Sequence, residues 1–264
     1  MNRKHKTIYY TDYSDDVVVN SNQDYEITEN YVYIHHNPFY RLASGIVYVL
    51  AAVIGFFYVH LWLRMSIRNR NVLKESGKNG YFLYSNHTQP IGDVILPGFV
   101  VGTSKRMYTV VSQANLGIKG IGKVLPLLGA LPIPENLHQM GSFQSAVEAR
   151  AKEGHVIAIF PEAHVWPYYT KIRPFSVTSF HFPVDCDLPV YSMTVTYQKA
   201  KWGKKPRCII YVDGPFRADK TWTKKEQRRW LHDQVYQAML ERSKNSNIEY
   251  IHYEKVRMRK KDEP

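Results

Sequence analysis

One long apolar stretch divides the chain into a short polar part and a larger remainder. Residues 42–63 contain no Asp, Glu, Lys or Arg, and Arg41 and Arg64 bracket them. A helix rises about 1.5 Å per residue, so this stretch just crosses a hydrocarbon core about 30 Å thick. The pattern predicts a membrane-associated helix with a basic flank over residues 41–70. A buried core helix and a half-inserted helix are the alternatives.

The basic residues after this stretch predict its orientation. Arg64, Arg68, Arg70 and Lys74 follow it closely, and basic flanks are typical of the cytoplasmic side of a membrane. We therefore expect the larger C-terminal part, residues 71–264, on the cytoplasmic side. Residues 1–40 form a polar, acidic and tyrosine-rich N-terminal segment to which the sequence assigns no function.

After residue 80, short apolar runs alternate with longer helical patterns. The runs have the length and the β-branched or aromatic content of buried strands, and they cover residues 81–86, 107–112, 155–161, 189–197 and 207–214. A helical pattern over residues 141–153 stops at Gly154, and Thr223 with Glu226 has the spacing of a capping box that opens a last helix. This alternation predicts an α/β domain whose mainly parallel sheet is flanked by helices.

The charge and the cysteines narrow the classes of function. The 264 residues include 35 Lys and Arg against 23 Asp and Glu, a formal excess of +12, which favours an anionic partner such as nucleic acid, an acidic membrane or a phosphorylated molecule. The membrane helix argues against nucleic acid. Cys186 and Cys208 are the only cysteines, too few for a disulfide framework or a zinc site, so we predict no metal.

Two strand ends carry the residues whose side chains are best suited to take part in a reaction. Asn86 ends the strand at 81–86 and His87 follows it, Asp93 is expected about one turn inside the next helix, and Glu162 follows the strand at 155–161. Carboxyl ends of parallel strands are where such sheets gather ligands. A histidine beside a carboxylate is a general-base arrangement. On the residues alone, a turn-capping histidine and a solvated glutamate explain the pattern as well.

In order and spacing, four blocks resemble the glycerolipid (lysophospholipid) acyltransferase family, which includes the 1-acylglycerol-3-phosphate acyltransferases. The blocks are Asn-His with a later Asp at 86–93, the glycine-led run 129–134, Phe-Pro-Glu at 160–162 and Leu-Pro-Val at 188–190. The resemblance implies that His87 takes the proton of a lipid hydroxyl, which attacks the thioester of acyl-CoA or acyl-carrier protein. Asp93 then orients the imidazole, and Asn86 and Glu162 belong to the substrate-binding part of the site.

The resemblance also implies a role in phospholipid biosynthesis, with the acyl donor as co-substrate and no cofactor. Three departures bear on the acceptor. Five residues, instead of four, separate His87 from Asp93; Glu135 and Asn136 follow Pro134, where the family has an Arg for the acceptor phosphate; and residues 163–165 are Ala-His-Val in place of Gly-Thr-Arg.

Lys171 and Arg173 are the candidates to contact an acceptor phosphate in place of the missing Arg. A solvated or membrane-facing basic turn, and a lysolipid without a phosphomonoester, are the alternatives. The competing function is a catalytically silent relative that binds anionic membrane lipid. A serine hydrolase is disfavoured because the chain has no Gly-x-Ser-x-Gly elbow. The sequence does not indicate an oligomeric state.

Overall fold

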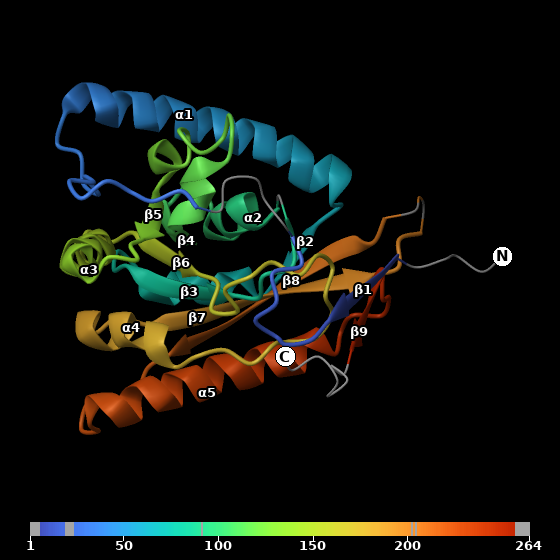
Figure 1. The fold of residues 1–264 in the computed structure, drawn as a ribbon. Helices are drawn as coiled ribbons and strands as arrows, with labels where there is room; N and C mark the ends of the chain where they lie inside the picture. The colour runs from blue at the N-terminus through green and yellow to red at the C-terminus, as the bar shows by residue number, and fades with distance from the viewer. Residues whose placement is uncertain (1–5, 19–23, 91, 202, 204, 257–264) are drawn as a thin grey trace, which may run out of the picture.

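The computed structural model describes residues 6–18, 24–90, 92–201, 203 and 205–256. Its centre is a seven-stranded sheet in the order β2-β8-β7-β3-β6-β4-β5 (Figure 1). In that order the strands are β2 (Ser66–Arg68), β8 (Arg207–Phe216), β7 (Val190–Gln198), β3 (Tyr81–Ser85), β6 (Val156–Ile159), β4 (Met107–Ser112) and β5 (Ala130–Ile133). Every neighbouring pair is parallel except β7 and β8. The prediction of a mainly parallel α/β sheet is therefore confirmed.

Helices cover both faces of the sheet because its strands are apolar on both sides (Figure 1). In β3, Tyr81 and Leu83 join one core cluster and Phe82 and Tyr84 join the other, as expected for successive side chains of a strand. The first cluster packs under α2 (Gly92–Val101). The second packs under α3 (Leu137–Lys152), α4 (His181–Cys186) and α5 (Lys224–Ser243).

The ends of these helices follow local capping rules. At α5 the predicted capping box between Thr223 and Glu226 is present. At α3 the helix begins earlier than the predicted residue 141, because the side chain of Asn136 accepts a hydrogen bond from the backbone N–H of His138. Short 3-10 helices cover Arg70–Ser76 (η2), Gln113–Gly117 (η3), Pro126–Leu128 (η4) and Thr178–Phe180 (η5).

The apolar stretch forms α1 (Pro38–Phe57), which continues as a π-helix over Tyr58–Trp62 (η1). Together they make the one helix in the described residues that is long and apolar enough to cross a membrane. Only 17% of the residues in its most apolar part are buried against the rest of the protein. This helix lies along the α/β domain on the α2 side (Figure 1). At one end the Ser44 hydroxyl bonds to the Leu127 carbonyl at 2.5 Å. At the other end Gly55 approaches Ile95 and Phe99 so closely that a side chain there would collide with them.

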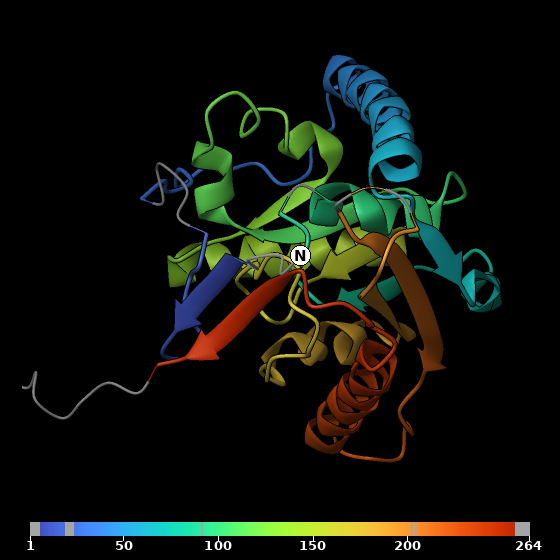
Figure 2. The same ribbon diagram turned by 90° about the vertical axis from the view of Figure 1, so that its right-hand side faces the viewer.

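A small second sheet joins the two ends of the described chain. β1 (Lys6–Tyr10) and β9 (Ile251–Lys255) pair in parallel, and Figure 2 shows them side by side and apart from the large sheet. The hydrophobic pattern did not predict either strand. Nor did it predict β2, which lies in the basic flank and adds to the large sheet beside β8. Both β1 and β2 lie outside residues 71–264, so segments from all three predicted regions contribute strands.

Candidate active site

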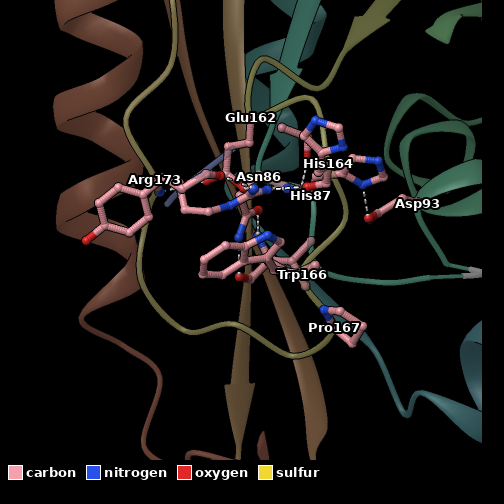
Figure 3. A network of polar contacts seen from close by, with 12 residues as sticks. Asn86, His87, Asp93, Glu162, His164, Trp166, Pro167 and Arg173 are labelled. Atoms are coloured by element: carbon pink, nitrogen blue, oxygen red, sulfur yellow. Dashed lines mark hydrogen bonds and ion pairs between the residues drawn. The ribbon is translucent and has the colours of Figure 1, made fainter. Parts of the chain in front are cut away.

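The site is built at the carboxyl ends of two neighbouring parallel strands. β3 and β6 pair in register, with Tyr84 opposite Ile159. The residues that follow these strands therefore leave the sheet at the same edge, as the sequence predicted. His87 comes two residues after β3, and Glu162 comes three residues after β6. Figure 3 shows both residues in one network of polar contacts.

His87 and Asp93 form a close pair. Nδ1 of His87 lies 2.6 Å from Oδ2 of Asp93, so the bond occupies Nδ1 and leaves Nε2 as the nitrogen that can accept a proton. The imidazole side chain is 23% exposed, and the carboxylate is 3% exposed. One face of the imidazole packs on the ring of Phe160, with 4.6 Å between ring centroids. The arrangement is a partly open base held by a buried acid.

The extra residue between His87 and Asp93 does not separate the two side chains. The helix α2 begins at Gly92. The turn before it is closed by two bonds between Gln89 and Asp93: the backbone N–H of Asp93 donates to the Gln89 carbonyl at 3.0 Å, and the backbone N–H of Gln89 donates to Oδ2 of Asp93 at 2.9 Å. Asp93 thus stays within reach of the imidazole.

Burial sets the electrostatics of this pair. It raises the pKa of the Asp93 carboxyl above 3.8, against the opposing effect of the hydrogen bond from His87. Burial also raises the pKa of the nearby Cys208 thiol, to about 12. The thiol is therefore neutral near pH 7, and the carboxyl of Asp93 is the acidic group bonded to His87.

Glu162 and Arg173 form a second, fully enclosed pair. Oε2 of Glu162 accepts from Nη2 of Arg173 at 3.1 Å and from the backbone N–H of His87 at 3.1 Å, while Oε1 accepts from the backbone N–H of Arg173 at 3.0 Å. The two side chains are 0% and 1% exposed. As the structure stands, neither charge is open to the acceptor or the phosphate that the sequence assigned to it. The pair instead ties the segment 162–173, called the site loop below, to the backbone of His87.

Asn86 is also enclosed, and it joins β3 to β7. Its side-chain amide donates to the Val195 carbonyl at 3.0 Å, and its side-chain oxygen accepts from the Val195 N–H at 2.8 Å. Asn86 therefore fixes the point where the chain leaves β3, immediately before His87. Among the predicted site residues, His87 is partly exposed and Lys171 is exposed.

A polar group beneath His87 escaped the sequence analysis. The Tyr197 hydroxyl lies 2.8 Å from the Thr88 hydroxyl and accepts from the Gln89 side chain at 2.9 Å. All three residues are buried, and together they hold the turn between His87 and Asp93. Thr88 and Gln89 stand inside the first block, but Tyr197 lies at the end of β7, and only the fold reveals that it reaches them.

The N-terminal segment also contributes to the site, through backbone carbonyls. The Asp15 carbonyl accepts from the indole N–H of Trp166 at 2.9 Å, and the Tyr13 carbonyl accepts from Nη1 of Arg173 at 3.2 Å. The guanidinium of Arg173 lies 4.7 Å above the Trp166 ring. Trp166 was not singled out from the sequence. The carbonyl partners have no signature in the sequence.

Among the described residues, no group of three or more His, Cys, Asp or Glu side chains is arranged to hold a metal ion. The chemistry this arrangement can perform is proton transfer at Nε2 of His87. The other ring nitrogen, Nδ1, is held by the buried carboxylate of Asp93, and the backbone of His87 is held by the site loop.

Comparison with known proteins agrees with this fold. Residues 64–196 match the family model described as Acyltransferase. No curated protein sequence matches the chain. Among solved structures, the fold is similar to that of the 1-acyl-sn-glycerophosphate (LPA) acyltransferase PlsC from Thermotoga maritima, with a TM-score of 0.56 and 13% identity over 82% of this chain and 87% of that one. At this identity the likeness concerns the fold.

Proposed function

The chain belongs to the acyltransferase family, and on this premise we propose that it moves a fatty acyl group from a thioester donor to a hydroxyl of a lysophospholipid. The observation that carries the proposal is the 2.6 Å bond between Nδ1 of His87 and Asp93, beside a partly exposed imidazole. The donor is acyl-CoA or acyl-carrier protein, and the product is a membrane phospholipid or its precursor. The solved structure similar in fold names 1-acyl-sn-glycerophosphate, which makes that lipid the first acceptor to try.

In the proposed reaction, Nε2 of His87 takes the proton of the acceptor hydroxyl as its oxygen attacks the thioester carbonyl carbon. The buried Asp93 carboxylate stabilises the imidazolium that forms. The new C–O bond is complete when the C–S bond breaks, and the imidazolium then gives its proton to the departing sulfur, which leaves as a thiol. The atoms and charges balance with no further reactant.

Glu162, Arg173 and Asn86 have positioning roles in this proposal. Asn86 holds the end of β3 through both of its bonds to Val195. Glu162 binds the backbone N–H of His87 while Arg173 holds Glu162. Together they restrict the backbone of His87 on both sides, and such restriction is what makes a general base effective. Lys171, which is exposed, keeps its predicted role at an acceptor phosphate.

We further propose that α1 attaches the protein to the cytoplasmic face of a membrane by lying in its surface. Large apolar side chains of α1 are exposed along its length, among them Phe39, Leu42, Ile46, Leu50, Ile54 and Phe57. The opposite side of the helix is tied to the domain at Ser44 and packed on it at Gly55. A helix held along its length against a polar domain fits the interface better than a full crossing.

The test is thiol release by the full-length protein in membranes, with acyl-CoA and acyl-carrier-protein donors and a mixture of lysophospholipids. We expect release that requires both a lysophospholipid and His87, with His87→Ala losing at least about 100-fold in rate. His252→Ala is the matched control, because it removes an exposed histidine paired with Glu249 at 3.1 Å. Folded wild-type protein that releases no more thiol than His87→Ala would favour the silent, lipid-binding relative instead.

A further inference from the structure

A second histidine, His164, is fastened beside His87. Two residues of the site loop, one before and one after His164, are hydrogen-bonded to the backbone of His87. The backbone N–H of His87 donates to the Glu162 carboxylate at 3.1 Å, and the backbone N–H of Trp166 donates to the His87 carbonyl at 2.9 Å. Between these anchors the chain makes a tight turn, with Ala163 in the left-handed region at φ +64°. His164 therefore has little freedom to leave the neighbourhood of His87.

The imidazole of His164 takes no part in bracing the loop. Only its backbone does so, because the His164 carbonyl accepts from Nη2 of Arg173. The side chain is 40% exposed, and Figure 3 draws its ring on the same side of the network as the ring of His87. The imidazole of His164 is half-exposed, is held near His87 and does not hold the site loop. It is therefore available to contact the acceptor lipid of the proposed reaction.

Asp16 brings a carboxylate to this histidine from the N-terminal segment. Its Oδ2 lies 3.9 Å from Nδ1 of His164. The segment is fixed to the site loop on the same stretch, since the Tyr13 and Asp15 carbonyls hold Arg173 and Trp166. His164 and Asp16 thus form a pair that joins two distant parts of the chain beside His87.

The exposed Lys171 can meet a phosphate, but the other charged residues considered for the acceptor do not favour a phosphomonoester. The guanidinium of Arg173 is buried and neutralised by Glu162. An exposed glutamate, Glu135, follows β5 at the point where the acceptor-phosphate Arg was expected. A dianionic phosphate next to His164 would also lie near the carboxylate of Asp16, and like charges at such distances repel each other.

We propose that His164 and Asp16 are the acceptor-headgroup contacts of this site, and that they favour a lysophospholipid headgroup with free hydroxyls, such as the glycerol of lysophosphatidylglycerol. The imidazole and the carboxylate both accept hydrogen bonds from hydroxyls. In such a headgroup the phosphate is a monoanionic phosphodiester and the glycerol hydroxyls form the outer end, whereas in 1-acylglycerol-3-phosphate the phosphomonoester is itself the outer end. This assignment rests on the proposed acyl transfer and specifies its acceptor.

The experiment measures kcat and KM for lysophosphatidylglycerol and for 1-acylglycerol-3-phosphate, with the full-length protein in detergent micelles and a saturating acyl donor. We expect the wild type to have the higher kcat/KM with lysophosphatidylglycerol. His164→Ala should raise KM for that lipid about fivefold to tenfold, the effect of one lost hydrogen bond, and leave KM for the donor unchanged. His164→Gln, which keeps a hydrogen-bonding side chain, should recover part of the loss.

Asp16→Asn gives the sharper result, because it removes charge and keeps shape. It should improve kcat/KM for 1-acylglycerol-3-phosphate relative to lysophosphatidylglycerol by about threefold to tenfold. The matched controls are His252→Ala and Glu249→Gln, an exposed histidine–carboxylate pair at 3.1 Å, which should not change the ratio. A wild type that prefers 1-acylglycerol-3-phosphate, or a ratio that Asp16→Asn leaves unchanged, overturns the headgroup assignment alone. Absence of His87-dependent transfer to every acceptor overturns the proposed acyl transfer as well.

Discussion

Two acidic side chains stand at the same edge of the sheet and differ in what surrounds them. Asp93 is buried, but its partner His87 is 23% exposed. Glu162 is equally buried, and its partner Arg173 is enclosed with it at 1% exposure. The first pair therefore leaves a ring nitrogen accessible, while the charges of the second pair neutralise each other inside the protein. In the proposed function the first motif performs the chemistry, and the second holds the loop.

Asp93→Asn should have the largest effect on activity. The substitution keeps the size of the side chain and removes the negative charge that stabilises a protonated His87. We expect kcat to fall about 100-fold to 10,000-fold while the protein stays folded, measured as thiol release under donor and acceptor saturation. Asp219→Asn, at an exposed loop carboxylate bonded to Thr221, is the control. A kcat within threefold of wild type would remove Asp93 from the mechanism.

Glu162→Ala should have the largest effect on stability. It leaves the guanidinium of Arg173 buried without its partner and removes the bond to the backbone N–H of His87. Breaking a buried ion pair from one side costs about 3–5 kcal/mol of unfolding free energy, which urea unfolding followed by tryptophan fluorescence measures. Lys220→Ala breaks an exposed pair with Asp187 and should cost less than about 1 kcal/mol. Equal losses for the two variants would contradict the distinction drawn above.

Asn86→Ala tests how much an uncharged side chain that joins the end of β3 to β7 contributes to stability. The variant loses both side-chain bonds to Val195 and leaves a buried N–H and carbonyl of β7 without partners. We expect a loss of about 1–3 kcal/mol in unfolding free energy. Asn247→Ala removes one exposed bond to the Lys199 N–H and should cost less. Equal stability of Asn86→Ala and Asn247→Ala would show that the two bonds from Asn86 to Val195 do not hold the end of β3.

The smallest effect concerns the pH dependence of stability. Burial raises the pKa of Asp93 above 3.8, so the ionised carboxylate is less favourable in the folded chain than in the unfolded one. This cost applies once the pH exceeds the pKa of Asp93 in the folded chain, and it is lost below pH 3.8, where the group is protonated in both states. Asp93→Asn should therefore melt above the wild type at pH 7, with a difference that shrinks toward pH 4. A variant that melts below the wild type at pH 7 would show that the bond to His87 outweighs burial.

The sequence predicted the parts of the fold that have a local pattern. The strands β3, β4, β6, β7 and β8 are runs of buried apolar residues, and α5 carries its capping box. The strands β1 and β9 lack such a pattern because they are stabilised by each other across nearly the whole chain. The strand β2 has only three residues, too few for any periodicity to be read.

For the site, the sequence located the residues but could not tell their exposure. His87 and Asp93 were predicted as a pair, and they lie 2.6 Å apart. Glu162 was assigned to the substrate from the resemblance and Arg173 as a replacement for the missing Arg, whereas the structure encloses both side chains. Arg173 lies against the Trp166 ring and donates to the Tyr13 carbonyl. Both of these come from parts of the chain whose positions only the tertiary structure determines, and carbonyl contacts leave no trace in residue type.

The pairing of β1 with β9 affects the order in which the protein can mature. The partner strand Ile251–Lys255 is synthesised long after residues 6–10, so the small sheet cannot form until then. Tyr253 of that strand also stacks on Trp166 at 5.1 Å and donates to the Pro167 carbonyl. The apolar α1, by contrast, emerges before β9 and can reach a bilayer during synthesis. With α1 attached to the membrane as proposed above, the nascent chain is expected to reach the bilayer before β9 completes the support of the site loop, so that the proposed acyl transfer starts at the lipid surface.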